Sequence, residues 1–285
     1  MTIRRRRSAL YVPASNPRAL AKARELTADV VIVDLEDAVA PEAKSSARDA
    51  VREWLRHAAR AGSELVVRSN GLDTPWGADD LDMLDTCAAA GAPPSAILLP
   101  KISAAGALVS CLERLPRAPD LPVWAMIETP GAILSVAQIA AAAPGRLACL
   151  VVGTNDLAKD AGITLDAART PLLAALTMTV LAARAHGLCV LDGVYNAIDD
   201  LAGFAQQCAQ GKAFGFDGKT LIHPNQIAPC HAAFAPTAAE VEAARRIVAA
   251  FAAPENAGRG ALRVDGRMVE RLHLQQAQRT LALSD

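Results

Sequence analysis

The chain has 285 residues and a mass of 29.7 kDa, a size that fits one large domain or two small ones. Its 29 Lys and Arg residues are balanced by 30 Asp and Glu residues. This balance argues against a nucleic-acid groove and a membrane-surface protein, which both need a basic excess. The hydrophobic content of 52% excludes a disordered chain, and no apolar run reaches the ~18 residues of a membrane span. The 6 cysteines stand singly, which argues against a zinc or iron–sulfur site and indicates the free thiols of a cytoplasmic protein.

Short apolar runs alternate with longer Ala-rich helical stretches along most of the chain. The first seven runs are nearly continuous Val, Ile and Leu, which is typical of strands buried on both faces. Helical signals separate them; for example, a helix is expected over 42–61, after Pro41 and before Gly62. The eight predicted strands cover residues 8–13, 29–36, 64–70, 95–101, 122–128, 147–153, 188–193 and 212–219.

Eight strand–helix alternations predict a (β/α)8 TIM barrel over residues 1–235, because parallel strands need such crossovers. The phosphate-binding motifs of doubly wound nucleotide-binding sheets, G-x-G-x-x-G and G-x-x-x-x-G-K-[ST], are absent from the sequence. After the barrel, we expect a helix over 236–252, a loop or arm over 252–268 and a terminal helix over 269–283. Residues 236–285 are therefore predicted to form a C-terminal helical extension that packs on a neighbouring protomer.

Polar residues gather at the carboxyl ends of the predicted strands, whereas the opposite ends show no comparable set. In a (β/α)8 barrel, chemistry takes place at the carboxyl ends, where the βα loops converge. Each residue alone also has a structural explanation; Arg68, for example, could simply pair with Asp34 or Glu36. The set comprises Asp34, Glu36, Asp37, Arg68, Asn70, Lys101, Glu128, Asn155, Asp156 and Asp192.

Glu128 and Asp156 follow adjacent predicted strands and offer hard oxygen ligands. Two carboxylates completed by water and substrate are typical of Mg²⁺, or of Mn²⁺ in its place, rather than of zinc. Arg68 offers a planar fork that suits a carboxylate. Together these residues predict a site for a small α-keto acid. His223 follows the eighth predicted strand and is a further candidate for contact with this site.

Motifs in order along nearly the whole chain resemble the HpcH/HpaI aldolase/citrate lyase family, in its citrate lyase β-subunit-like branch. The combination of DLEDAV, R-x-N, I-E-T and G-T-x-D-L carries the resemblance. The longer matching segments are SALYVPASNP, DVVIVDLEDAVAPEAKSSAR, VVRSNGLDTPWGADDL, ILLPKI, AMIETPGAI, GTNDLAKD and GFDGKTLIHPNQI. The resemblance implies a Mg²⁺-dependent (β/α)8 barrel, assembled as a homotrimer or homohexamer, that binds a coenzyme A thioester and a small keto acid.

By its motifs, the resemblance also implies roles for individual residues. Glu128 and Asp156 match the metal ligands, and Arg68 matches the residue that binds the keto-acid carboxylate. Glu36 and Asp37 match the acidic pair beside the metal, with Asp37 a candidate for acid–base chemistry. The residues that match positions near the coenzyme A phosphates are Arg7, Lys44 and Arg48.

One departure concerns the C-terminal residue that does acid–base chemistry in a neighbouring subunit's site. The family usually carries M-I-D there, whereas this chain has Met268, Val269 and Glu270. The carboxylate is retained with one more methylene, so Glu270 is expected to take the catalytic role with altered reach.

These observations favour a carbon–carbon lyase that cleaves a malyl- or citramalyl-CoA type thioester into acetyl-CoA and a keto acid. The alternative within the family is a citrate lyase β-subunit acting on a citryl thioester of an acyl-carrier protein. GTNDL also occurs in phosphoenolpyruvate-utilising barrels, but those need phosphohistidine and ATP-binding domains for which 285 residues leave no room. A non-catalytic binding protein would be supported by the Glu270 departure alone.

Overall fold

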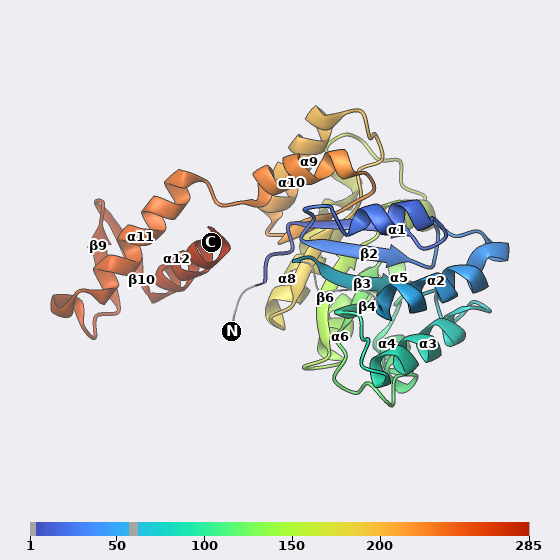
Figure 1. Ribbon diagram of the computed structural model, residues 1–285. Coiled ribbons are helices and arrows are strands. Elements are labelled where there is room, and N and C mark those ends of the chain that lie inside the picture. Colours follow the sequence, from blue (N-terminus) through green and yellow to red (C-terminus); the bar gives the residue numbers. More distant parts are fainter. Residues whose placement is uncertain (1–3, 57–61, 285) are drawn as a thin grey trace. The chain divides into compact units, whose positions relative to one another are not determined.

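The computed structural model describes residues 4–56 and 62–284 (Figure 1). The chain divides into two compact units. The larger unit comprises Arg6–Ala233, and the smaller one comprises the chain from Phe234 onward together with Arg4 and Arg5. No helix in the described ranges is both long and apolar enough to cross a membrane.

The larger unit is a closed barrel of parallel strands, and the predicted (β/α)8 fold is confirmed. Strand β1 pairs with β2 on one side and with β8 on the other, which closes the sheet. The strands are β1 (Ser8–Pro13), β2 (Val30–Asp34), β3 (Glu64–Arg68), β4 (Ala96–Leu99), β5 (Val123–Ile127), β6 (Leu147–Val152), β7 (Cys189–Asp192) and β8 (Gly218–Leu221).

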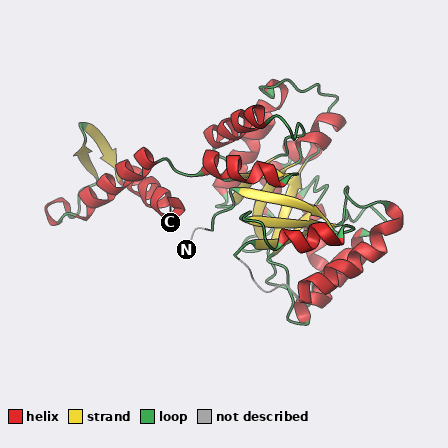
Figure 2. Cartoon of the chain, turned by 45° about the horizontal axis from the view of Figure 1, so that its top comes forward, coloured by secondary structure: helices red, strands yellow, loops and turns green. Residues whose placement is uncertain are grey.

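Helices connect the strands and surround the barrel (Figures 1 and 2). Asn16 and Thr129 cap α1 and α5 by accepting hydrogen bonds from backbone N–H groups, and each is followed by a proline at the first helical position. Residues 57–61, predicted to complete the helix over 42–61, lie outside the described residues. The helices are α1 (Pro17–Ala23), α2 (Lys44–Arg56), α3 (Gly77–Ala89), α4 (Ala105–Glu113), α5 (Pro130–Leu134), α6 (Val136–Ala141), α7 (Thr154–Asp160), α8 (Leu173–Ala185), α9 (Leu201–Phe214) and α10 (Ile227–Phe234).

The eighth strand lies later in the chain than the sequence predicted. The expected range was 212–219, but β8 begins at Gly218, and residues up to Phe214 belong to α9. Gly215 ends α9 in the left-handed conformation, with φ of 96°, which glycine adopts without a steric penalty. The apolar character of the end of α9 was therefore mistaken for the start of a strand.

The barrel core consists of alternate residues of the strands. Since successive side chains of a strand point to opposite faces, residues two apart on each strand share the interior. This inner cluster is built from Ala9, Val30, Ile32, Val66, Ala96, Leu98, Trp124, Met126, Cys149, Val151 and Leu191. The intervening residues of the same strands face the helices, which explains why the strands are apolar on both faces.

The smaller unit contains α11 (Ala238–Ala252), β9 (Ala261–Val264), β10 (Arg267–Glu270) and α12 (Arg271–Ser284), with α11 packed against α12. Strands β9 and β10 form an antiparallel hairpin around Asp265 and Gly266, whose φ values are 48° and 77°. The expectation of a loop over 252–268 is therefore wrong for these strands. Asp-Gly is a strong hairpin signal, because both positions tolerate a positive φ.

Candidate active site

Three predicted site residues continue the inward-facing side of their strands at the carboxyl end of the barrel. Asp34, Arg68 and Glu128 each follow a residue of the inner cluster by two positions. The alternation of side chains along a strand therefore places all three above the apolar core. All three are buried, so the barrel core ends in a layer of charged groups.

The guanidinium of Arg68 is held by carboxylates from the end of β2. Its Nε and Nη2 donate to the two carboxylate oxygens of Asp34, each at 2.7 Å. Its Nη1 lies 2.8 Å from Glu36 Oε2 and 3.2 Å from Asp37 Oδ2, and its carbon Cζ lies 4.8 Å from the centre of the Tyr11 ring. The pairing that the sequence left open as a structural explanation is thus present. It gives the guanidinium a fixed orientation at the rim.

Burial lowers the pKa of Arg68, but Asp34, Tyr11 and Glu36 outweigh this effect, and the pKa stands well above its ordinary value. Burial also disfavours the charged form of Glu36, which here is the carboxylate. Burial raises the pKa of Glu36 to about 8; Arg68 opposes this increase, and Glu128 and neighbouring aspartates add to it. Glu36 can therefore hold or release a proton near neutral pH.

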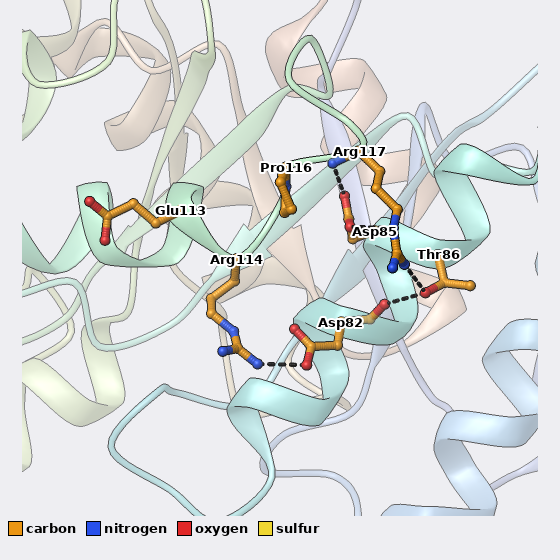
Figure 3. A pocket seen from close by; sticks show the side chains of 7 residues that line it. All are labelled: Asp82, Asp85, Thr86, Glu113, Arg114, Pro116 and Arg117. Carbon is orange, nitrogen blue, oxygen red and sulfur yellow. Dashed lines mark hydrogen bonds and ion pairs between the residues drawn. The ribbon is translucent and has the colours of Figure 1, made fainter.

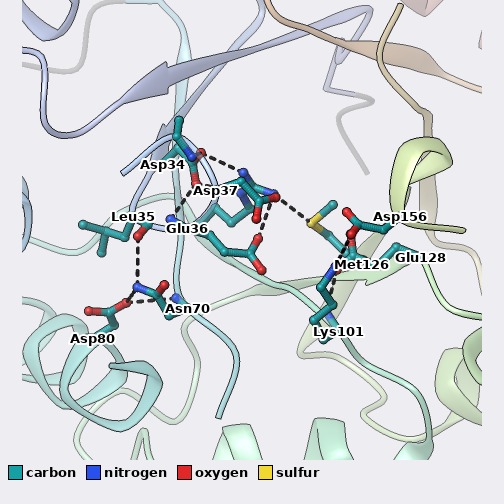
Figure 4. A network of polar contacts seen from close by, with 12 residues as sticks. Asp34, Leu35, Glu36, Asp37, Asn70, Asp80, Lys101, Met126, Glu128 and Asp156 are labelled. Carbon is teal, nitrogen blue, oxygen red and sulfur yellow. Dashed lines mark hydrogen bonds and ion pairs between the residues drawn. The ribbon is translucent and has the colours of Figure 1, made fainter. Parts of the chain in front are cut away.

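Glu128 and Asp156 share the ammonium group of Lys101 (Figure 4). Lys101 Nζ lies 2.7 Å from Asp156 Oδ1 and 3.8 Å from Glu128 Oε1. The backbone N–H of Lys101 also donates to Glu128 Oε1, at 2.7 Å. The other oxygen, Glu128 Oε2, is buried and has no hydrogen-bond partner among the described residues. Burial raises the pKa of Glu128, although Lys101 opposes the shift.

Gly153 leaves the space that the Glu128 side chain occupies. It follows Val151 of the inner cluster by two positions and faces the same side as that cluster. A Cβ atom on Gly153 would lie 2.4 Å from Glu128 Cβ and 2.5 Å from Glu128 Oε2, closer than packed atoms approach. The first residue of the G-T-x-D-L motif is therefore small because the neighbouring strand carries a carboxylate.

Hydrogen bonds from Lys44 hold the acidic turn after β2 in place. Its ammonium donates to the backbone carbonyls of Leu35 and Glu36, each at 2.8 Å, and to Asn70 Oδ1 at 2.7 Å. These three bonds use every N–H of the buried ammonium, so Lys44 supports the turn in this structure, and its contact with coenzyme A phosphates stays a prediction. Asn70, which was not assigned a role from the sequence, links the turn to the loop after β3.

Arg48 lies one helical turn after Lys44 and binds the start of α3. Its Nε donates to Asp80 Oδ1 at 2.8 Å, and its Nη1 donates to Asp79 Oδ2 at 3.2 Å. Asp80 in turn accepts from the backbone and side-chain N–H groups of Asn70. Arg48 thus supports the same loop, and its contact with coenzyme A phosphates stays a prediction.

Two residues of the predicted set do not reach the rim of their own barrel. Arg7 precedes β1, at the amino end, and its guanidinium donates twice to Asp29 at 2.8 Å. Arg7 therefore does not line the rim of its own barrel, and its contact with coenzyme A phosphates stays a prediction. Asp192 faces the helix layer, where it accepts from Arg169 at 2.6 Å and from Lys219 at 2.9 Å. The alternation on β7 directs Leu191, not Asp192, into the barrel.

The amino end of the barrel also carries charged residues, in addition to the set predicted at the carboxyl end. Ion pairs join Arg6 to Glu64, Arg7 to Asp29 and Arg184 to Asp217. Most of these residues directly precede strands, whereas Glu64 begins β3 and Arg184 belongs to α8. They pair with one another. They stabilise the closed end of the barrel and form no acidic surplus.

His223 and Glu270 make local contacts within their own segments. His223 accepts the backbone N–H of Asn225 through Nδ1 at 3.2 Å and so caps the turn after β8. Glu270 ends β10 in the smaller unit, where its backbone N–H donates to His273 Nδ1 at 2.9 Å. The role of Glu270 in a neighbouring site stays a prediction.

A cavity of about 310 Å³ lies on the outside of the barrel, beside α3 and the end of α4 (Figure 3). The charged groups in it bind one another: Arg114 pairs with Asp82, and the backbone N–H of Arg117 donates to Asp85 at 2.9 Å. The cavity is lined by Asp82, Asp85, Thr86, Glu113, Arg114, Pro116 and Arg117, none of which belongs to the rim site.

The rim residues fit a hard divalent cation such as Mg²⁺. Within residues 4–56 and 62–284, no three His, Cys, Asp or Glu side chains gather in a metal-binding arrangement. Mg²⁺ instead binds through one or two carboxylates and keeps several waters. Glu128 and Asp156 supply two carboxylates, and the unpartnered Glu128 Oε2 is an available ligand atom. The five carboxylates Asp34, Glu36, Asp37, Glu128 and Asp156 face two cations, Arg68 and Lys101.

The fold and the site define a (β/α)8 barrel with an arginine and a surplus of carboxylates at its carboxyl end. The family model for HpcH/HpaI aldolase/citrate lyase matches residues 7–224. The chain is 47% identical to a (3S)-malyl-CoA thioesterase of Cereibacter sphaeroides strain KD131, over 98% of this chain and 94% of that protein. It is 33% identical to the citrate lyase subunit beta of Escherichia coli K12, over 99% of this chain and 94% of that protein.

Among solved structures, the chain is similar to protein CitE from Mycobacterium tuberculosis in complex with magnesium, acetoacetate and coenzyme A. The TM-score is 0.76 at 32% identity, and the match covers 98% of each chain. The protein described here therefore belongs to the HpcH/HpaI aldolase/citrate lyase family, in its citrate lyase β-subunit-like branch. The names of these two relatives describe a malyl-CoA thioesterase and a subunit of a citrate lyase.

Proposed function

We propose that the protein is a Mg²⁺- or Mn²⁺-dependent enzyme that cleaves a malyl- or citramalyl-CoA type thioester at a carbon–carbon bond. The products would be acetyl-CoA and a keto acid. One observation carries this proposal. The oriented guanidinium of Arg68 and the carboxylate pair of Glu128 and Asp156 lie at the same rim of the barrel. The relatives support the substrate class, because malyl-CoA, citrate, and magnesium with acetoacetate and coenzyme A occur in their names.

Glu128 and Asp156 would hold the cation, with water and substrate oxygens in the remaining positions. When bound, the cation would act as a Lewis acid towards the oxygen that changes from hydroxyl to keto. Arg68 would bind the substrate carboxylate through the Nη1 and Nη2 edge of its guanidinium, because Asp34 occupies the Nε and Nη2 edge. Asp34 and the Tyr11 ring hold its plane before substrate arrives, so little ordering is needed on binding.

Cleavage requires two proton transfers. The β-hydroxyl loses its proton, the electron pair of the carbon–carbon bond moves to the thioester as an enolate, and the enolate carbon gains a proton to become the methyl group of acetyl-CoA. Glu36 is the acceptor for the hydroxyl proton, because its pKa of about 8 allows both protonation states near neutral pH. Glu270 of a neighbouring protomer supplies the proton to the enolate carbon, with the exposed Asp37 as the alternative donor.

Hydrolysis of the thioester is the second candidate. It is favoured by the 47% identity to the thioesterase and by Glu270 at the position where the family usually has Asp. In this reaction water adds to the thioester carbonyl, the carbon–sulfur bond breaks, and the coenzyme A thiolate leaves and takes up a proton. The same Arg68 and carboxylates would bind the malyl group, so the two reactions share a substrate and differ in the bond that breaks.

The experiment that separates the candidates measures two products from one incubation with Mg²⁺ and malyl-CoA, citramalyl-CoA or a citryl thioester. Keto acid is trapped as its hydrazone, and free coenzyme A thiol is titrated with a disulfide reagent. Keto acid without free thiol supports carbon–carbon cleavage, and free thiol without keto acid supports hydrolysis. If neither product forms from any of the thioesters, the proposed function is wrong.

A further inference from the structure

Lys101 occupies the space between the two carboxylates to which the proposed function assigns the metal. Its ammonium lies 2.7 Å from Asp156 Oδ1 and 3.8 Å from Glu128 Oε1. A divalent cation bound by the same oxygens would lie within a few ångströms of that nitrogen. Two positive groups at such a separation repel strongly in a partly buried site, so the ammonium and the cation cannot share it in this arrangement.

The backbone conformation of Lys101 and its hydrogen bond to Glu128 place the side chain at this position. Its φ is 54°, which makes it one of three non-glycine residues with a positive φ among those described. Such a conformation is unfavourable for a residue with an unbranched side chain, and it persists when surrounding contacts support it. The supporting contact is the 2.7 Å hydrogen bond from the Lys101 backbone N–H to Glu128 Oε1. The backbone therefore stays attached to the carboxylate while the four-carbon side chain can rotate away.

The side chain has room to leave, because the Lys101 side chain is 30% exposed and that of Asp156 is 27% exposed, whereas the Glu128 side chain is 1% exposed. An ammonium at the solvent-facing side of the pair can move to water at small cost. The buried Glu128 carboxylate cannot follow it. Glu128 would then depend on another positive group to compensate its charge.

We infer that Lys101 is a built-in, displaceable cation that occupies the Glu128–Asp156 pair until a divalent cation replaces it. Lys101 would then affect both the stability of the metal-free barrel and the affinity for the metal. It stabilises the barrel without metal by separating two carboxylates that would otherwise repel each other. It also weakens metal binding, because the cation must displace the ammonium before it can bind.

The test compares the parent protein with Lys101→Met, which keeps the length of the side chain and removes its charge. Mg²⁺ and Mn²⁺ binding is measured by calorimetric titration, and thermal unfolding is followed with a chelator and with saturating Mg²⁺. Lys101→Met should bind the cations about tenfold more tightly. Its Tm should fall below that of the parent in chelator and recover on addition of Mg²⁺, so that the metal-induced increase in Tm is larger than in the parent.

Two further variants keep the test sharp. Lys101→Asn also removes the charge, and asparagine tolerates a positive φ, so it serves if Lys101→Met fails to fold. Lys22→Met, a matched loss of charge at an exposed lysine of α1, an element that carries neither carboxylate of the pair, should change neither the metal affinity nor the metal-induced shift in Tm.

This inference rests on the proposed metal site, and the titration separates the two. If the parent protein binds neither cation, the proposed metal site is wrong. If the parent binds them and both Lys101 variants bind with unchanged or weaker affinity, the metal site stands and the displaceable lysine is overturned.

Discussion

At the scale of single residues, the site consists of charged groups whose neighbours decide their chemistry. Arg68 keeps its charge under burial because Asp34 accepts from two of its nitrogens. Glu36 has no comparable support, since its Oε2 lies 2.8 Å from Arg68 Nη1 without the alignment of a hydrogen bond. Two acidic residues of one turn therefore differ in function: Asp34 orients the arginine, and Glu36 can exchange a proton.

Arg68→Lys should lower kcat/KM by about 100-fold, because lysine presents a point charge and loses the bidentate fit to the substrate carboxylate. Mg²⁺ affinity measured by calorimetry should change little, since Arg68 pairs with Asp34, Glu36 and Asp37 and not with the Glu128–Asp156 pair. Arg56→Lys, an exposed arginine on α2, is the matched control and should retain full activity. Unchanged kinetics in Arg68→Lys would leave Arg68 with a structural role only.

Glu36 should make the stability of the metal-free protein decrease as the pH rises from about 5 to about 8. Its pKa is raised from 4.5 to about 8 on folding, so the folded state binds more protons than the unfolded state in this range, and stability falls with pH. Glu36→Gln removes this proton and should flatten the decrease. Denaturant unfolding of both proteins at pH 5, 6.5 and 8 measures the difference; parallel curves would show that the Glu36 pKa is not raised.

At the scale of elements, the residues at the ends of neighbouring strands complement one another in size and in polar contacts. Strand β5 delivers Glu128 into the barrel, and the residue after β6 is Gly153, which has no side chain to compete for that space. On the other side, Lys44 of α2 holds the turn after β2 against the loop after β3. The loops that carry the site are thus positioned by buried polar contacts between consecutive βα units.

Gly153→Ala should weaken Mg²⁺ binding by at least about tenfold, because the new methyl group would push the Glu128 carboxylate out of its place. The expected loss of stability is about 1–3 kcal/mol, the usual cost of inserting a methyl group into a packed site. Gly106→Ala in α4, where a Cβ meets nothing within 4 Å, is the matched control. Equal metal affinity for Gly153→Ala and the parent would contradict the assigned role of Gly153.

At the scale of the whole molecule, the proposed chemistry needs two units of the chain that come from different protomers. The rim lies in the unit Arg6–Ala233, and Glu270 lies in the other. The smaller unit exposes the large apolar side chains of Met268 and Leu272, with 71% and 57% of their surface accessible. We expect a second copy of the chain to cover them in a homotrimer or homohexamer, and sedimentation of a monomer would contradict this.

Glu270→Gln should abolish turnover without unfolding the barrel or preventing assembly, because it removes the proton and keeps the shape of the side chain. Glu270→Asp should keep or raise activity, since it restores the acid usual in the family. Mixing inactive Glu270→Gln with inactive Arg68→Ala protomers should restore part of the activity, as some sites would combine an intact Arg68 with an intact Glu270. Full activity in Glu270→Gln would transfer the proton donor role to Asp37.

The sequence by itself determined the barrel and the edge of it at which the candidate site residues gather. Buried parallel strands must be apolar on both faces, so charged residues directly after them stand out, and Arg68, Glu128 and Asp156 were identified in this way. The hairpin of the smaller unit was predictable from its Asp-Gly turn but was missed.

Only the tertiary structure decided which charged residues face one another. The acceptors of Lys44 come from the turn after β2 and from Asn70, which lies 26 residues after Lys44. No local sequence pattern predicts that contact. The same is true of the contacts of Lys101 with Glu128 and Asp156, because these three residues follow three different strands. Arg7 and Asp192 resemble site residues in sequence, yet strand direction and side-chain alternation place them elsewhere. Local patterns determine the elements, whereas contacts between distant charges depend on the closure of the barrel.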